Sequence, residues 1–161
     1  MGVKYVGGER NLGKTFVIGV GNYLFGDEGV GVHVVKKLME LKLPEDVEVI
    51  DGGTGGVALL EFFEKADRVI VVDAALGGGE PGDVYVINPS QLEREEVRVL
   101  ASLHEMNLYT LMEVAEELNI LPEVIVVGVE PKEYNKMSTS LSREVEAALP
   151  KVIEKILELI Y

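Results

Sequence analysis

The order of apolar and polar residues predicts strands and helices that alternate along most of the chain. Short runs such as RVIVVD at 68–73 are apolar at consecutive positions, which is typical of strands buried on both faces of a parallel sheet. Longer segments repeat apolar residues every three or four positions, as amphipathic helices do. Strands are predicted at 16–20, 47–50, 68–73, 84–87 and 124–129, and helices at about 28–41, 57–63, 108–118 and 142–160.

Two details of the pattern refine this α/β fold. The segment 74–83 is short and rich in Gly and Pro, so it leaves no room for a crossover helix, and strand 84–87 is expected to run antiparallel. The fold class is therefore α/β with a mostly parallel, five-stranded mixed sheet. Ser142 is expected to cap the last helix, and Pro150 is expected to kink that helix or divide it in two.

The chain length fits one domain. A chain of 161 residues buries roughly 70% of its unfolded surface and holds a core without disulfides. Residues 1–15 are polar and show no periodicity, so they are expected to form a flexible N-terminal extension, with a single domain at 16–161. Nothing in the pattern indicates an oligomeric state.

Composition and charge exclude several classes of function. The net charge of −13 opposes binding to nucleic acid phosphates and to anionic lipids. The chain has no cysteine, which excludes disulfides, thiolate metal sites and a cysteine nucleophile. No apolar run is long enough for insertion into a membrane, and no signal peptide is visible, so we expect a cytoplasmic location.

The first strand leads into a glycine-rich turn, GVGNYLFGDEG, which invites comparison with nucleotide-binding loops. Gly19 and Gly21 match the start of the dinucleotide fingerprint, but Leu24 occupies the position of its third glycine. The acidic Asp51 also lies about 30 residues further on instead of about 20. A nucleotide site is therefore disfavoured.

Two protease signatures are incomplete. His104 and Glu105 match the start of the zinc-protease motif HExxH, but Leu108 stands where the second histidine is needed. The G-x-S-x-G motif of serine hydrolases is absent.

Three residues remain that the topology would bring to one edge of the sheet: Glu28 after the first strand, Asp73 at the end of the central strand, and His104 before the third helix. One imidazole and two carboxylates suit a divalent metal with open coordination positions. On position alone, Asp73 is equally well explained as a residue that caps a turn. Asp27 is expected to be structural, binding backbone donors at the helix start.

Five motifs occur in order, GNYLFGDEGVG, DGGTGG, VIVVDAA, LHEMNL and GVEPKEYNKMSTSLS, and this set closely resembles the hydrogenase maturation proteases. Members of that family are endopeptidases that remove a C-terminal extension from the large subunit of [NiFe] hydrogenases. The resemblance covers about residues 16–161 and implies a three-layer α/β/α sandwich. It also implies that Glu28, Asp73 and His104 form the metal-binding and catalytic cluster, with the general base left open.

The resemblance implies that nickel arrives already installed in the large-subunit precursor, so no permanent cofactor is expected. In this interpretation, Asp51, Gly52, Gly53 and Thr54 of the DGGTGG motif position the substrate, or else only shape the sheet edge. A second function class stays open: a non-catalytic assembly factor that binds the nickel-loaded subunit without cutting it.

Overall fold

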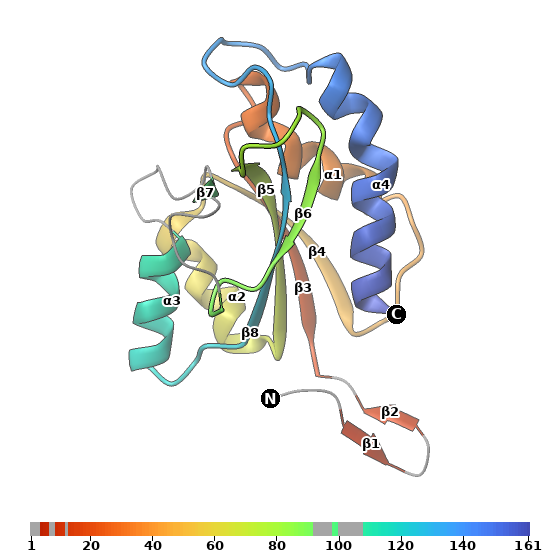
Figure 1. Ribbon diagram of the computed structural model, residues 1–161. Helices are drawn as coiled ribbons and strands as arrows, with labels where there is room; N and C mark the ends of the chain where they lie inside the picture. The colour runs from red at the N-terminus through yellow and green to blue at the C-terminus, as the bar shows by residue number, and fades with distance from the viewer. Residues whose placement is uncertain (1–3, 7–8, 12, 92–97, 100–107) are drawn as a thin grey trace.

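The computed structural model describes residues 4–6, 9–11, 13–91, 98–99 and 108–161 (Figure 1). Its main sheet contains the strands β3 (Thr15–Val20), β4 (Val47–Gly53), β5 (Arg68–Leu76), β6 (Val84–Ile87) and β8 (Glu123–Val129), to which the short β7 (Arg98–Val99) is added. The helices are α1 (Val30–Leu38), α2 (Leu59–Lys65), α3 (Leu108–Glu117) and α4 (Arg143–Ile160), with 3₁₀ turns η1 (Gly26–Gly29) and η2 (Gly56–Ala58).

The sheet has the strand order β4-β3-β5-β8-β6. The first four strands are parallel, whereas β6 runs antiparallel to β8 from the pair Val84 and Val129 to the pair Ile87 and Val126. The predictions of a mostly parallel mixed sheet and of an antiparallel strand 84–87 are confirmed. The two-residue β7 extends the sheet beside the end of β5 and was not predicted.

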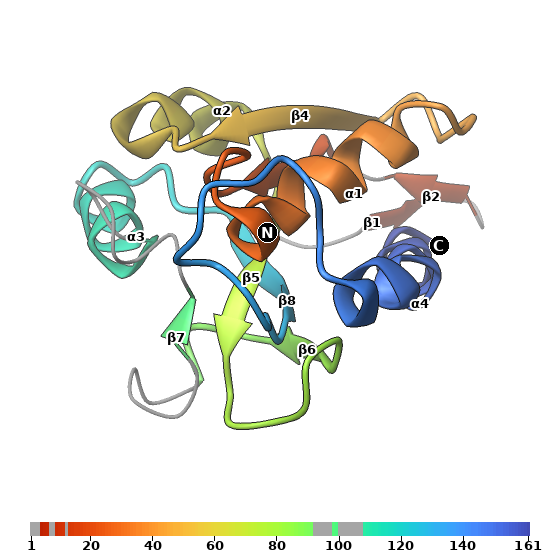
Figure 2. The same cartoon turned by 90° about the horizontal axis from the view of Figure 1, so that it is seen from above.

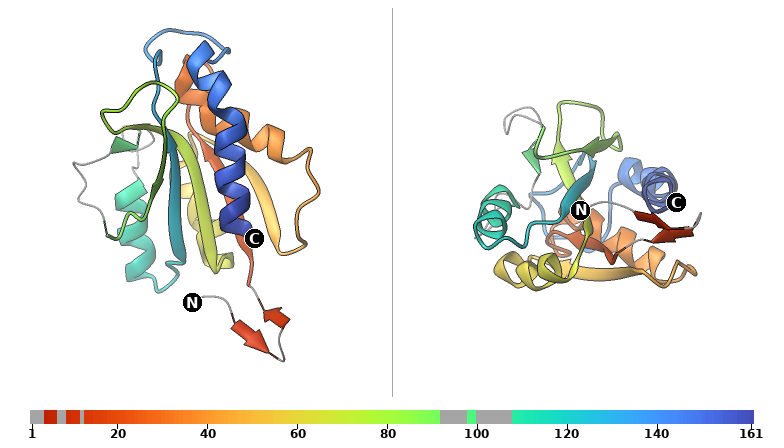
Figure 3. Two further views of the ribbon diagram at one scale, coloured as in Figure 1. Left: turned by 45° about the vertical axis from the view of Figure 1, so that its right-hand side comes forward. Right: turned by 90° about the horizontal axis from the view of Figure 1, so that it is seen from below.

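Helices cover both faces of the sheet. Figures 2 and 3 show α1 and α4 on one face and α2 and α3 on the other. Each face has its own buried apolar cluster: Val17 and Ile70 lie with α1 and α4, whereas Ile18 and Val71 lie with α2 and α3. The three-layer arrangement implied by the resemblance is therefore confirmed, and the sheet is apolar on both faces because helices pack on both.

The central strand is longer than the apolar run predicted. β5 continues past Asp73 to Leu76, and the pairing of β5 with β8 extends to Ala74. The expectation that Asp73 ends the strand is therefore wrong. Since side chains alternate along a strand, Asp73 projects from the same face as Val69 and Val71, toward the layer of α2 and α3.

The N-terminal extension contains regular structure that the sequence pattern did not predict. β1 (Lys4–Val6) and β2 (Glu9–Asn11) pair antiparallel in a sheet of their own. Figure 1 shows this hairpin beyond the start of β3 and away from the main sheet. Thr15 already belongs to β3, and the division into a flexible extension at 1–15 and a domain at 16–161 stays a prediction.

The helix α4 is single and amphipathic. Ser142 caps it as predicted, accepting a hydrogen bond from the backbone N of Val145 at 3.4 Å. Pro150 lies inside the helix without dividing it, because Leu149 and Val152 continue the buried face on either side. Of the two outcomes predicted for Pro150, a kink or a division, the division does not occur. No helix among the described residues is long and apolar enough to cross a membrane, and the cytoplasmic location stays a prediction.

Replacing Pro150 by Ala should stabilise the protein. The alanine restores a backbone donor within α4 and improves helix propensity, while the unfolded chain gains some entropy. The net gain in the free energy of unfolding should be about 1–2 kcal/mol, measured by urea denaturation. Glu154→Ala, at an exposed position of the same helix, is the control and should change stability by less than about 0.5 kcal/mol. A destabilised Pro150→Ala variant would contradict this account.

Candidate functional site

The ends of β3 and β5 meet the turn before α1 at a single glycine. Gly21 follows β3 directly and has φ +128°. A Cβ atom added there would lie 2.0 Å from the carbonyl oxygen of Glu28 and 3.1 Å from Oδ1 of Asp73. Only glycine fits this position, and its two neighbours are two of the predicted site residues. The backbone of Glu28 and the carboxylate of Asp73 therefore both lie beside Gly21, and the convergence of the two carboxylates in one site stays a prediction.

The two carboxylates differ in exposure. Asp73 is fully buried at 0% exposure, whereas Glu28, in the 3₁₀ turn η1, is partly exposed. Asp73 is therefore closed to solvent, whereas Glu28 keeps some access to it. The third predicted residue, His104, lies outside the described residues. Within the part of the chain that the structure describes, no three His, Asp or Glu side chains form a metal-binding group.

Asp27, the neighbour of Glu28, is a buried structural carboxylate. It is 0% exposed, and its Oδ2 accepts hydrogen bonds from the backbone N of Lys132 at 2.9 Å and of Glu133 at 3.0 Å. Ser142 donates its hydroxyl to Oδ2 and its backbone N to Oδ1, both at 2.8 Å. Asp27 is therefore structural, as predicted, but these four donors come from the distant segment 132–142 and not from the start of the first helix.

Backbone pairing reinforces this attachment. The backbone N of Asp27 donates to Glu133 O at 2.8 Å, and that of Gly26 donates to Ser138 O at 2.8 Å. Ser138 donates in turn to Leu24 O at 2.7 Å. The segment 131–142, called here the Asp27 loop, is therefore held against the turn that carries Glu28.

The DGGTGG motif lies on the other side of Gly21. The backbone N of Gly21 donates to Gly53 O at 2.7 Å, and Asp51 accepts from the backbone N of Gly53 at 3.1 Å. Asp51 thus acts as a turn former, as its sequence context predicts. Gly53 has φ +50°, and a Cβ atom there would meet no atom of the described residues within 4 Å. The substrate-positioning role of 51–54 stays a prediction.

Sequence reasoning missed Glu130, which follows β8. This carboxylate is 6% exposed, and its Oε1 accepts from the backbone N of Gly77 at 2.9 Å and of Gly79 at 3.0 Å. The hydroxyl of Tyr85 donates to the same oxygen at 2.6 Å. Burial, followed by this hydrogen bond, raises the pKa of Tyr85 to about 12. Glu130 therefore fixes the loop after β5; a Glu directly after a buried strand was the available signal.

His33 lies on α1, and its side chain is partly enclosed. Its ring stacks on Tyr23 with centroids 4.8 Å apart, and the Lys36 ammonium lies 4.3 Å from the centre of the Tyr23 ring. Its Nε2 is buried and has no hydrogen-bond partner among the described residues. Burial lowers the pKa of His33 below its usual value, against the opposing effect of Glu146. The stack holds Tyr23 of the glycine-rich turn on α1.

Replacing Asp27 by Asn should destabilise the fold strongly. Either orientation of the amide directs its NH₂ group at a donor, which leaves buried groups without acceptors. We expect a loss of at least about 3 kcal/mol in the free energy of unfolding, measured by chemical denaturation. Asp51→Asn is the matched control: Asp51 is exposed and accepts one bond at 3.1 Å, so the loss should stay below about 1 kcal/mol. Equal losses of unfolding free energy in the two variants would show that the buried hydrogen bonds of Asp27 contribute no more to stability than the exposed one of Asp51.

His33 should make stability depend on pH. Because its pKa in the folded chain lies below the usual 6.5, the unfolded chain binds a proton in mild acid that the folded chain does not. This contribution is present above about pH 6.5 and is lost as pH falls from there through the lower, folded pKa. Urea denaturation at a series of pH values should show a shallower decline for His33→Gln than for the wild type. If the two proteins gave parallel curves of unfolding free energy against pH, His33 would not be the source of this pH dependence.

Comparison with known proteins agrees with this geometry. The family model described as hydrogenase maturation protease matches residues 32–159, which include Asp73 and His104 and begin just after Glu28. The chain is 32% identical over 147 residues to HoxM, a hydrogenase expression/formation protein of Azotobacter vinelandii, covering 90% of this chain and 71% of that one. It is 37% identical over 145 residues to a putative hydrogenase maturation protease of Methanocaldococcus jannaschii, and the match covers 88% of this chain and 92% of that one.

Solved structures show the same fold. The hydrogenase maturating endopeptidase HybD of E. coli superposes with a TM-score of 0.79 at 28% identity, over 91% of each chain. A hydrogenase 2 maturation peptidase from a Thaumarchaeota archaeon gives a TM-score of 0.67 at 34% identity, over 91% of this chain and 97% of that one. With this fold, these relatives and this edge of the sheet, the chain belongs to the hydrogenase maturation proteases, a family of peptide-bond hydrolases.

Proposed function

We propose that this protein is the endopeptidase that removes the C-terminal extension of a nickel-loaded [NiFe] hydrogenase large-subunit precursor. The observation that carries the proposal is that the backbone carbonyl of Glu28 and the carboxylate of Asp73 both border Gly21, in the sheet of a maturation-protease fold. In α/β sheets, the carboxyl edge is where ligands bind. The nickel ion belongs to the substrate in this proposal and serves as its recognition element.

The chemistry of the donors supports recognition of a metal that is already held elsewhere. Carboxylates from Glu28 and Asp73, with the imidazole of His104, offer hard and intermediate ligands but no thiolate. Three such groups leave coordination positions open, in contrast to a closed structural site. A nickel ion that keeps its ligands in the precursor can therefore also be coordinated by these three groups during a single encounter.

The reaction is the hydrolysis of one peptide bond. Attachment of the precursor through its metal fixes the scissile peptide at the edge of the sheet, and such positioning lowers a barrier by several kcal/mol. Water is activated either by the metal or by one of the carboxylates. The backbone N–H groups of the DGGTGG loop, beside Gly21, are the candidates to stabilise the developing oxyanion.

The decisive test is to incubate the protein with nickel-loaded and with nickel-free precursor and to follow the precursor mass. We expect the loaded form to be shortened and the nickel-free form to stay intact, because only the former offers the shared metal. Processing of both forms alike would defeat recognition through nickel. An unchanged mass of the loaded precursor, with binding retained, would favour the assembly-factor alternative.

The two histidines of the chain provide a matched control for this test. His104→Gln should lower the rate of cleavage by more than about 100-fold, the loss typical of a removed catalytic group. His33→Gln, assayed above pH 7, should cleave at nearly the wild-type rate. Full activity of His104→Gln would show that this histidine is not part of the catalytic site.

A further inference from the structure

The glycine-rich turn that carries Glu28 is attached to α1 through the ring of Tyr23. We propose that Tyr23 is a positioning residue that acts through Glu28, and that His33, which stacks on its ring, weakens this positioning in mild acid. The inference rests on the proposed function and gives the same site a pH-dependent control.

Tyr23 lies directly against the backbone that follows Glu28. A Cβ atom added at Gly29 would lie 2.8 Å from Cα of Tyr23 and 3.2 Å from the carbonyl oxygen of Asn22. The chain between these points is tightly turned: the backbone N of Phe25 donates to Asn22 O at 3.1 Å. The backbone N of Glu28 donates in turn to Phe25 O at 3.2 Å. A displacement of Tyr23 is therefore passed on to Glu28.

Side chains of α1 hold Tyr23 in place, and the apolar core does not. The ring of His33 stacks on it with centroids 4.8 Å and planes 22° apart, and the Lys36 ammonium lies 4.3 Å from its centre. These two residues of α1 are three positions apart, so they share one face of the helix. Tyr23 is partly exposed and belongs to neither apolar cluster of the described residues. Removing its ring therefore frees the turn and leaves the core intact.

The attachment through Tyr23 complements the one through Asp27. Asp27 joins the turn to the Asp27 loop and to the cap of α4, whereas Tyr23 joins it to α1. One attachment alone leaves the turn free to rotate about it. A coordinating or catalytic group has to be held within about 0.5 Å of its working geometry, and attachments to two separate elements provide this for Glu28.

His33 makes the stack sensitive to protonation. Burial is the largest influence on the pKa of His33 and lowers it below the usual 6.5, and the nearby Lys36 ammonium acts in the same direction. Glu146 of α4, the backbone of Thr139 in the Asp27 loop and Asp27 of η1 act in the opposite direction and do not outweigh burial. A charged imidazole needs hydration that the stacked position denies it. Protonation therefore loosens the contact of this ring with Tyr23.

The first test removes the ring of Tyr23. Tyr23→Leu should lower kcat/KM for the nickel-loaded precursor by about 10- to 100-fold, the loss that a displacement of about 1 Å causes. Tyr23→Phe keeps a stacked ring and should restore most of the rate. Tyr161→Leu, at a position that is 70% exposed, is the control and should leave kcat/KM unchanged. Full activity of a folded Tyr23→Leu variant would overturn the role of Tyr23.

A double-mutant cycle separates positioning from a general weakening of the fold. Its readout is the dissociation constant of the nickel-loaded precursor, which is measurable in variants that do not cleave. Tyr23→Leu alone should weaken binding by about 10-fold, but by less than about 3-fold when it is added to Glu28→Gln, because Glu28 no longer coordinates nickel. Losses that multiply would show that Tyr23 acts independently of Glu28.

The pH arm compares the wild type with His33→Gln, whose amide is planar and neutral at every pH. Ionisation of Glu28, Asp73 and His104 affects both proteins, so it cancels in the ratio of their kcat/KM values. The wild-type rate should fall below that of His33→Gln as pH drops from about 6.5, by up to about 10-fold if protonation displaces Tyr23 fully. A constant ratio would overturn the role of His33, and this arm is readable even if Tyr23→Leu does not fold. Absence of cleavage by the wild type above pH 7 would instead overturn the proposed function.

Discussion

The buried carboxylate of Asp27 is the interaction on which the shape of the candidate site depends. A buried charge without partners costs several kcal/mol, and Asp27 is stable at 0% exposure because four donors surround it. Those donors lie more than 100 residues away in sequence, in the Asp27 loop and at the start of α4. One side chain thus unites the turn that carries Glu28, the loop that covers it and the cap of α4.

The adjacent acidic residues Asp27 and Glu28 have separate tasks because of the local backbone. Both lie in the 3₁₀ turn η1, where three residues complete one turn and neighbouring side chains point about 120° apart. Asp27 is directed into the protein, while Glu28 keeps partial access to solvent. The pair therefore combines a rigid attachment with a group that a substrate can reach, and neither residue can replace the other.

Much of the fold could be predicted because burial on both faces leaves a clear pattern. The strands around Ile18, Ile70 and Val126 are runs of apolar residues, and the helices show their stripes plainly. The end of β5 was misjudged because a carboxylate normally marks a strand end, whereas Asp73 is followed by three more strand residues. Pro150 does not divide α4, because the apolar face of the helix packs on both sides of it and tertiary burial outweighs a local break.

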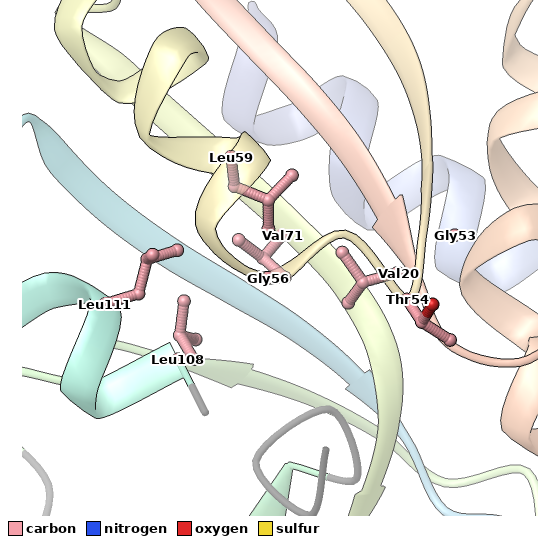
Figure 4. Close-up of a pocket in the computed structure, with 8 residues that line it drawn as sticks. All are labelled: Val20, Gly53, Thr54, Gly56, Leu59, Val71, Leu108 and Leu111. Atoms are coloured by element: carbon pink, nitrogen blue, oxygen red, sulfur yellow. The ribbon is translucent and has the colours of Figure 1, made fainter. Parts of the chain in front are cut away.

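The candidate site was predicted only in part. Topology alone predicted that Glu28 and Asp73 converge, because parallel strands deliver their ends to one edge, and the structure shows the backbone of Glu28 and the carboxylate of Asp73 beside Gly21. Sequence could not give the partners of Asp27 or the role of Glu130, since both depend on donors from distant loops. A small apolar pocket lined by Val20, Leu59 and Leu111, among others, was equally hidden, because these residues read as ordinary core positions in the sequence (Figure 4).

The attachment of Asp27 to Ser142 also has a consequence for the order of events during protein synthesis. The chain emerges from the ribosome N-terminus first, so Asp27 becomes available more than 100 residues before its partners. Until Ser142 has been made, the carboxylate stays hydrated and the turn beside it lacks its fixed shape. A nascent chain that already has β3, β4 and β5 is therefore not yet a protease, and hydrolytic capacity arises only when synthesis of the domain is nearly complete.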